Sequence, residues 1–178
     1  YLVDMLREGY FQALMDVQCF DLKAVESIRD DPRHQEVSAM RYASPGARSA
    51  AVDSLDVVVL GATEVDTGFN VNVHTDSNGL IMGGSGGHSD TAAGAKLAIV
   101  VAPLLRGRLP MVLDRVNTIV TPGETVDVII TERGLAVNPK RTDLLDRLKD
   151  TRLPVLDIRE LQDIAYKRSG TPASAETT

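Results

Sequence analysis

The sequence predicts an α/β fold built on an open, mostly parallel sheet within a single domain. The run of consecutive apolar residues Val57–Leu60 lacks the alternation of a half-buried strand, so we expect a strand covered on both faces. Two further apolar runs, LAIVV and VDVIIT, follow a segment with helical character. A length of 178 residues suits one domain with its own core.

The segment before this strand is predicted to be mainly helical. Apolar side chains recur near helical spacing from Tyr1 to Met15, which predicts an amphipathic helix with Gly9 as its weak point. Asp21 is expected to cap a second helix, LKAVESIR, which ends at the DDP turn. We expect an edge strand next, QEVSAM, and then a loop with a short helix, SPGARSAAVDSL.

The middle of the chain predicts a hairpin and a glycine loop. In ATEVDTGFNVNVH, the residues Asp66–Gly68 supply turn chemistry, and Val71 and Val73 alternate with polar side chains. The DSNG turn then leads into a short strand, LIM, which precedes the glycine loop. A helix is expected to begin near Ser89.

The last third predicts strands followed by helices. Proline and glycine separate the expected strands LAIVV, MVLDRV and VDVIIT. Helices are expected around Arg141–Lys149 and Ile158–Lys167. Residues 1–168 then form the folded domain, and the polar segment 169–178, SGTPASAETT, is predicted to be a disordered tail.

Composition excludes several functional classes. A net charge of -6 without a dense basic run argues against a nucleic-acid surface. No apolar run reaches the roughly 18 residues of a membrane span, and acidic residues near the start are unlike a signal peptide. The single cysteine, Cys19, excludes a disulfide within the chain, so we expect a reducing compartment, the cytoplasm. A start at Tyr1 indicates a processed product or a fragment.

The segment GGSGGHSDTAAGAK places four glycines in the five residues Gly83–Gly87. Glycine permits positive φ and lets a ligand approach bare N–H groups, so this loop suits an anion or a developing oxyanion. A dinucleotide motif fails because its third glycine is replaced by Ser89, and no GK[ST] follows for a phosphate loop. The alternative is a tight turn into a helix, with Ser89 or Asp90 as the N-cap.

Glu64 follows the predicted strand directly, where side chains of open α/β sheets face the ligand crevice. A carboxylate there can act as a nucleophile, or it can be a solvated turn residue. The neighbouring DTG triplet, Asp66–Gly68, suggests an aspartic protease, but that chemistry needs two such carboxylates. The hairpin context favours a turn instead.

Other polar residues favour structural roles. A metal site is conceivable from two histidines and two aspartates, but the turn and cap positions of the aspartates, with no HExxH or paired CxxC, predict none. These four residues are His74, Asp76, His88 and Asp90. Cys19 is predicted to be a buried structural thiol, and His34 is expected at the surface.

Four segments together resemble the C-terminal half of the citrate lyase alpha chain family, which are citrate CoA-transferases. The resemblance covers nearly the whole chain except the polar tail, and residues 60–96 are its most specific part. TERG is shared more widely among CoA-transferases and acyl-CoA hydrolases. The segments are DVQCFDLKAVES, LGATEVDTGFNVNVHTDSNGLIMGGSGGHSDTAAGAK, APLLRGRLP and TPGETVDVIITERGLAVNP.

The resemblance implies the CoA-transferase type of open sheet, here as the C-terminal domain of a two-domain chain. It also implies acyl exchange, in which acetyl on an acyl carrier protein is replaced by citrate, giving citryl-carrier and acetate. The thiol belongs to a CoA-like prosthetic group of the carrier, so this step needs no metal. Implied partners are citrate, the acetyl thioester, and the carrier (gamma) and lyase (beta) chains of an oligomer.

The resemblance also implies roles for particular residues. CoA-transferases that form an enzyme thioester have a catalytic glutamate in a pattern like ALEADxxGxxN, which Glu64 matches in ATEVDTGFNVN. Members similar to citrate lyase alpha let citrate attack directly, so Glu64 is either a nucleophile or a positioning group. The loop Gly83, Gly84, Ser85, Gly86 and Gly87 is expected to cradle the thioester and its pantetheine arm.

Other possibilities stay open on the sequence. The trianion citrate needs local positive charge, for which Arg106, Arg108 and Arg133 are candidates, although each can be a solvated surface residue. An acyl-CoA hydrolase or a related CoA-transferase would use similar motifs. The chain can also be a non-catalytic half that serves assembly of the lyase.

Overall fold

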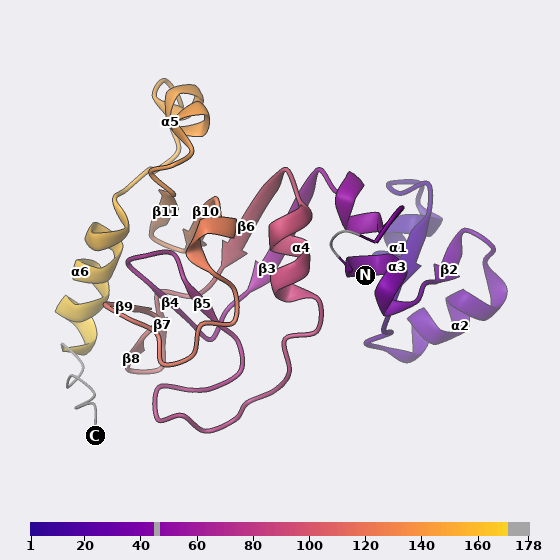
Figure 1. The fold of residues 1–178 in the computed structure, drawn as a ribbon, viewed down its shortest axis with the longest axis horizontal. Helices are drawn as coiled ribbons and strands as arrows, with labels where there is room; N and C mark the ends of the chain where they lie inside the picture. The colour runs from indigo at the N-terminus through magenta and orange to yellow at the C-terminus, as the bar shows by residue number, and fades with distance from the viewer. Residues whose placement is uncertain (45–46, 171–178) are drawn as a thin grey trace. The chain divides into compact units, whose positions relative to one another are not determined.

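The structure, a computed structural model, describes residues 1–44 and 47–170 (Figure 1). Contacts divide the chain into two compact units that meet between Asp53 and Ser54. The predicted α/β class is confirmed, because helices and strands occur in both units and most sheets contain parallel pairs. One folded domain over residues 1–168 stays a prediction. Most of the predicted tail, residues 171–178, lies outside the described residues.

The first unit contains short helices around a two-stranded parallel sheet. The predicted helix from Tyr1 to Met15 is wrong beyond its first turns, because the helix ends early and Gly9 adopts φ +83°. The residues after it form a strand that pairs in parallel with the second strand. The elements are α1 (Leu2–Arg7), β1 (Leu14–Asp16), α2 (Leu22–Asp30), β2 (His34–Glu36), α3 (Ala39–Ala43) and η1 (Ala51–Ser54).

Local capping explains the remaining boundaries of this unit. Asp21 caps α2 as predicted, since its side chain accepts a hydrogen bond from the Ala24 amide at 2.8 Å. The strand expected over QEVSAM is shorter, because Ser38 caps α3 instead. His34 was expected at the surface but is 2% exposed, with Nε2 3.1 Å from Asp16 Oδ2 on the neighbouring strand.

The second unit is built on a four-stranded sheet in the order β11-β10-β6-β3. Strands β3, β6 and β10 run parallel, whereas β11 pairs antiparallel with β10. The mostly parallel sheet is therefore confirmed, and β11 is a strand that the sequence analysis missed. The strands are β3 (Val57–Gly61), β6 (Leu97–Val101), β10 (Val128–Thr131) and β11 (Gly134–Val137).

Strand β3 lies at the edge of this sheet, so the expectation that Val57–Leu60 is covered on both faces is wrong. Val57 is 47% exposed and Val59 is 65% exposed, and both point to the same face. The strands of the sheet that are well buried are β10 and β11. A run of apolar residues predicts a strand, but it does not determine whether one face or both faces of that strand are buried.

A smaller sheet holds the predicted hairpin. Strands β4 (Glu64–Asp66) and β5 (Val71–Asn72) pair antiparallel, as expected, and β4 also pairs in parallel with β9 (Val112–Leu113). Strands β7 (Leu105–Arg106) and β8 (Leu109–Pro110) form a separate pair. The short strand expected over LIM is only a bridge between Thr75 and Ile81.

The α-helices α4, α5 and α6 and the short 3-10 helix η2 complete the second unit. The predicted helices near the C-terminus are confirmed as α5 and α6, and a capping box of Asp157 and Glu160 starts α6. Helix α4 begins at His88, and its N-cap is Gly87 rather than Ser89 or Asp90. The helices are α4 (His88–Gly94), η2 (Gly123–Thr125), α5 (Thr142–Leu148) and α6 (Ile158–Ser169).

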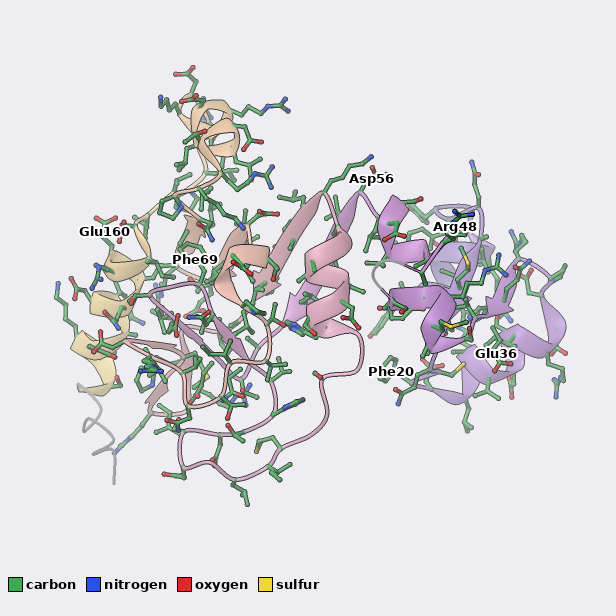
Figure 2. The ribbon with its side chains drawn as sticks, in the orientation of Figure 1. Phe20, Glu36, Arg48, Asp56, Phe69 and Glu160 are labelled. Atoms are coloured by element: carbon green, nitrogen blue, oxygen red, sulfur yellow. The ribbon has the colours of Figure 1, made fainter. Side chains whose placement is uncertain are left out.

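The main core joins the four-stranded sheet and the β5-β4-β9 sheet to α6. Phe69, labelled within the fold in Figure 2, is 3% exposed and packs with apolar side chains of strands and of α6, whereas Glu160 lies on the outer side of that helix. Burial of such side chains is the main stabilising term of a domain. Within residues 1–44 and 47–170, we find no helix with the length and apolar composition that crossing a membrane requires.

His88 fastens the start of α4 to the end of β3. Its Nε2 lies 2.8 Å from the Gly61 carbonyl, which can only accept, so Nε2 carries the proton. Its Nδ1 then accepts from the Thr121 hydroxyl at 2.6 Å. Burial lowers the pKa of His88 from 6.5, although the hydrogen bond to Gly61 opposes this shift. The neutral ring is therefore the form that the fold holds.

Gly123→Ala should destabilise the second unit strongly. A Cβ at this position would lie 2.0 Å from the Gly68 carbonyl oxygen, which is backbone and cannot swing away. We expect a loss of about 3 kcal/mol or more, since overpacking alone costs about 1 to 3 kcal/mol. Thermal unfolding measures this, and Gly61→Ala is the control because a Cβ there meets nothing within 4 Å. Equal melting temperatures for the two variants would contradict the inference that close packing requires glycine at position 123.

Stability should fall on acidification, in part through His88. Because the folded-state pKa is below the ordinary 6.5, the unfolded chain gains a proton as pH drops through 6.5 while the folded chain resists it. The stabilisation is present above that pH and is lost below it. We expect His88→Gln to be less stable at pH 7.5 and to show a smaller fall in Tm between pH 7.5 and 5.5. The same fall in both proteins would rule out this contribution.

Candidate functional site

Glu64 opens β4, directly after the carboxyl end of β3. Its side chain is 1% exposed, so the alternative of a solvated turn residue is wrong. Oε1 accepts a hydrogen bond from the Ser77 hydroxyl at 2.5 Å, and Oε2 accepts one from Asn72 Nδ2 at 3.2 Å. Both carboxylate oxygens are therefore held in a fixed orientation.

Asn72 connects Glu64 to the loop that follows β5. The Asn72 side chain is 0% exposed, and its Nδ2 also donates to the carbonyl and the hydroxyl of Thr75. Its Oδ1 accepts from the amides of His74 and Thr75 at 3.0 and 3.1 Å. These partners fix which end of the amide faces Glu64, because only Nδ2 can donate to the carboxylate.

His74 extends this network to the glycine loop. The amide of Ser85, in the middle of the loop, donates to His74 Nε2 at 3.0 Å. The His74 carbonyl also accepts from the Met82 amide, one residue before the glycines begin. A continuous series of hydrogen bonds therefore runs from Glu64 through Asn72 and His74 to Ser85, so the structure brings the two predicted parts of the site together.

The glycine loop presents an open backbone. Gly83, Gly84 and Gly86 are exposed, Gly86 has φ +54°, and a Cβ at any of the three would meet nothing within 4 Å. Within the part of the chain that the structure describes, the amides of Gly83, Gly84, Gly86 and Gly87 have no hydrogen-bond acceptor. The Ser85 amide is the exception, because His74 occupies it. These glycines leave room on the exposed side instead of permitting close packing.

The site lies at the carboxyl edge of the parallel sheet, where ligands of open α/β sheets bind. The bond from His88 to the Gly61 carbonyl places the end of the glycine loop beside the end of β3. Arg106 also reaches this edge, since its Nη2 lies 3.4 Å from the Ala62 carbonyl. Of the other candidate arginines, Arg108 is exposed, and Arg133 Nε lies 4.0 Å from Glu132.

The DTG carboxylate has a structural role. Asp66 is 2% exposed, and its Oδ1 accepts from the amides of Gly68 and Asn70 at 2.9 and 3.0 Å. Its Oδ2 accepts from the Val116 amide at 3.2 Å. These bonds hold the hairpin turn and tie it to a distant loop, which agrees with the turn that the sequence analysis favoured over a protease dyad.

Three of the four residues considered for a metal have other hydrogen-bond partners, and His74 Nε2 accepts from the Ser85 amide. His88 uses both ring nitrogens, and Asp76 Oδ1 accepts from the amides of Asn78 and Leu80 at 2.9 Å. Over residues 1–44 and 47–170, no three His, Cys, Asp or Glu side chains lie close enough to share a metal ion. The donor set here suits hydrogen bonding within the fold.

Cys19 lies in the first unit beside a cavity of about 210 Å³, whose lining includes Asp16 and Glu36. The thiol is partly exposed, so the prediction of a buried structural thiol is wrong in that respect. Burial, and then the Asp16 carboxylate, raise the pKa of the Cys19 thiol. A raised pKa lowers the thiolate fraction, which disfavours a nucleophilic role.

Asn72 and Ser77 were not predicted as parts of the site, and His74 was predicted to be solvated or hydrogen-bonded rather than to bind a metal. Asn72 had no local signal, because a polar residue in a hairpin is unusual only if its side chain is fully buried. That burial becomes visible only when the smaller sheet has formed. Ser77 belongs to the DSNG turn, and no sequence pattern links it to Glu64.

Comparison with known proteins identifies the family of this chain. The family described as "Citrate lyase, alpha subunit (CitF)" matches residues 1–178. The citrate lyase alpha chain of Klebsiella pneumoniae is 50% identical over 177 residues, which are 99% of this chain and 35% of that protein. The Escherichia coli K12 chain is 48% identical over the same shares of the two sequences. This chain thus spans about a third of the length of these relatives, and its placement in their C-terminal half stays a prediction.

Solved structures support the same relationship. An alpha subunit of citrate lyase from Streptococcus mutans, in complex with citrate, has a TM-score of 0.92 and 48% identity, covering 96% of this chain and 34% of that one. RipA from Yersinia pestis shares the fold at a TM-score of 0.59 and 17% identity, covering 93% of this chain and 40% of that one. The chain therefore belongs to the citrate lyase alpha subunit family, as its motifs predicted.

Proposed function

We propose that the full-length protein exchanges acyl groups on a carrier thioester as part of citrate lyase, replacing acetyl with citrate. One observation supports this most directly. The buried Glu64 carboxylate and the open glycine loop are joined by hydrogen bonds through Asn72 and His74 at the ligand-binding edge of the sheet. Such a site offers free N–H donors to a reacting carbonyl, from a loop that hydrogen bonds connect to a fixed carboxylate.

Similarity to citrate lyase alpha chains supports citrate as the acceptor acid of this protein. The Streptococcus mutans structure is in complex with citrate, and its fold agrees with this chain at a TM-score of 0.92. Arg106 is the arginine placed nearest the site by a contact, because it reaches the Ala62 carbonyl next to Thr63 and Glu64. We assign its guanidinium to a citrate carboxylate, since arginine suits carboxylate recognition.

The glycine loop fits the carrier's thioester. During acyl exchange, negative charge develops on the thioester oxygen, and preorganised N–H donors can each contribute about 2.7 to 4 kcal/mol. The amides of Gly83, Gly84, Gly86 and Gly87 are the donors without an acceptor in the described chain. Exposed apolar side chains next to them, Ile81 and Met82, suit the alkyl parts of a pantetheine arm. The CoA-like group of the carrier supplies the thiol.

We assign Glu64 the role of a positioning group, which orders the site through Asn72 and Ser77, rather than that of a nucleophile. The exchange breaks an acetyl–sulfur bond and forms a citryl–sulfur bond, so one oxygen of citrate leaves with acetate if citrate attacks directly. A nucleophilic Glu64 would need an accessible oxygen, but both of its oxygens accept hydrogen bonds and the side chain is 1% exposed. Direct attack by a citrate carboxylate does not require an accessible oxygen of Glu64.

The wider assembly follows from the same proposal. The partners are an acyl carrier (gamma) chain that brings the thioester and a lyase (beta) chain that cleaves the citryl product, in an oligomer located in the cytoplasm. Membership of the citrate lyase alpha family supports a multi-subunit setting. The step itself uses a carboxylate, amides and an arginine of this chain, without a metal.

Glu64→Gln in the full-length protein should lower acetyl-to-citrate exchange by about 10- to 100-fold. The new amide would turn a donor toward Asn72 Nδ2 or toward the Ser77 hydroxyl, and a hydrogen bond to a charged group is worth about 1.5 to 3 kcal/mol. Steady-state turnover with acetyl-carrier and citrate measures the effect. Glu124→Gln, at an exposed position in η2, is the matched control and should be unchanged.

Two results of that assay would contradict the proposal. Unchanged turnover with Glu64→Gln would give Glu64 a purely structural role and favour a non-catalytic assembly half. Loss of the thioester without any acceptor acid would instead indicate an acyl-CoA hydrolase. Both outcomes are measured with the same carrier substrate, so they can be separated in one experiment.

Oxygen-18 citrate should place its label in the released acetate during a single turnover. Direct attack transfers one citrate oxygen to the acetyl carbon, whereas an enzyme thioester would leave the label on Glu64 and release unlabelled acetate in the first cycle. Mass spectrometry of acetate and of the peptide containing Glu64 distinguishes the two. Label on that peptide would show that Glu64 is the nucleophile and that its assignment as a positioning group is wrong.

A further inference from the structure

We infer that His74 is a positioning residue that sets the arrangement of the glycine loop relative to Glu64. This inference rests on the proposed function, because the loop matters to catalysis only if it receives the thioester. On the sequence, a solvated or hydrogen-bonded role was favoured over a metal site for His74, and the structure shows a hydrogen-bonded ring, because Nε2 accepts from the Ser85 amide.

His74 is fixed at three points that belong to different parts of the site. Its amide donates to Asn72 Oδ1 at 3.0 Å, which ties it to the side chain that holds Glu64. Its carbonyl accepts from the Met82 amide at 2.6 Å. Its Nε2 accepts from the Ser85 amide at 3.0 Å. A movement of the Ser85 backbone is therefore opposed by a ring whose own backbone is bonded to the Glu64 network.

The bond to Ser85 defines the state of the His74 ring. A backbone amide can only donate, so Nε2 must present its lone pair, and the proton of the neutral ring is on Nδ1. A side chain can replace His74 in this role only if it places an acceptor at the same distance from the backbone. Glutamine can place its Oε1 near the position of Nε2, whereas asparagine is shorter by one carbon.

The glycine loop needs such an anchor because of its composition. Glycine has the largest conformational freedom to lose on ordering, and a Cβ at Gly83, Gly84 or Gly86 would meet nothing within 4 Å, so packing does not restrict these residues. The Ser85 amide is bonded to His74, and the amides on either side of it remain free for the thioester oxygen. The bond between Ser85 and His74 therefore holds the neighbouring free amides in place without occupying them.

The test compares His74→Asn with His74→Gln in the full-length protein. Hydrogen exchange of the Ser85 amide should become about tenfold faster in His74→Asn and stay near the original rate in His74→Gln. In the exchange reaction, His74→Asn should lower kcat about tenfold with a smaller change in KM, since the free amides act on charge that develops in the transition state. His74→Gln should restore most of kcat.

Melting temperatures within about 2 °C of each other for the two variants would show that the comparison reports on the loop instead of the fold. An unchanged Ser85 exchange rate in His74→Asn would overturn the anchor. Equal loss of kcat in both variants, despite a protected Ser85 amide in His74→Gln, would overturn the positioning role. Absence of acyl exchange in the unsubstituted protein would overturn the proposed function, while the Ser85 exchange rates would still decide the anchor.

Discussion

The side-chain amide of Asn72 is the constraint on which the site depends. A fully buried amide must satisfy both its donor and its acceptor, because an unpaired polar group in the interior costs about 1 to 3 kcal/mol. Asn72 meets this requirement with Glu64, Thr75 and the amide of His74. The same bonds that make its burial tolerable also fix the Glu64 carboxylate and the start of the loop that leads to the glycines. Positioning of the site is thus a consequence of satisfying one buried group.

The parallel sheet explains why these residues meet where they do. The carboxyl ends of β3, β6 and β10 lie at one edge, and the chain continues from the end of β3 to Glu64 at the start of β4 and from the end of β6 to Arg106 in β7. His88 closes this arrangement, because its neutral ring joins the β3 end to Thr121. The hydrogen bonds of His88 hold this edge together, and the loop that follows Met82 adds exposed backbone to it.

Glycine occurs in two opposite environments in this chain. Gly123 is required by close packing, since its backbone lies against that of Gly68 and its amide donates to Asn70 Oδ1. Gly83, Gly84 and Gly86 have empty space where a side chain would stand. Packing does not require glycine at these positions, although the φ of +54° at Gly86 favours it there. In the proposed function, the bare backbone of this loop lets a thioester approach its amides. An acidic protein can in this way present local donors to an anionic substrate without a cluster of basic residues.

The sequence by itself determined the α/β class with its mostly parallel sheet, the hairpin at Asp66–Gly68 and the cap of α2, because these depend on periodicity and on contacts between near neighbours. It also selected Glu64, from its place after a strand, and the glycine loop, from its four glycines before a helix. Only the tertiary structure decided that β3 is an edge strand, that His34 is buried, and that the chain beyond α1 forms a strand. The hydrogen bonds of Asn72, His74 and Ser77 likewise became visible only there. Burial and hydrogen-bond pairing of these residues come from partners distant in sequence or in other loops, and no local pattern specifies such partners.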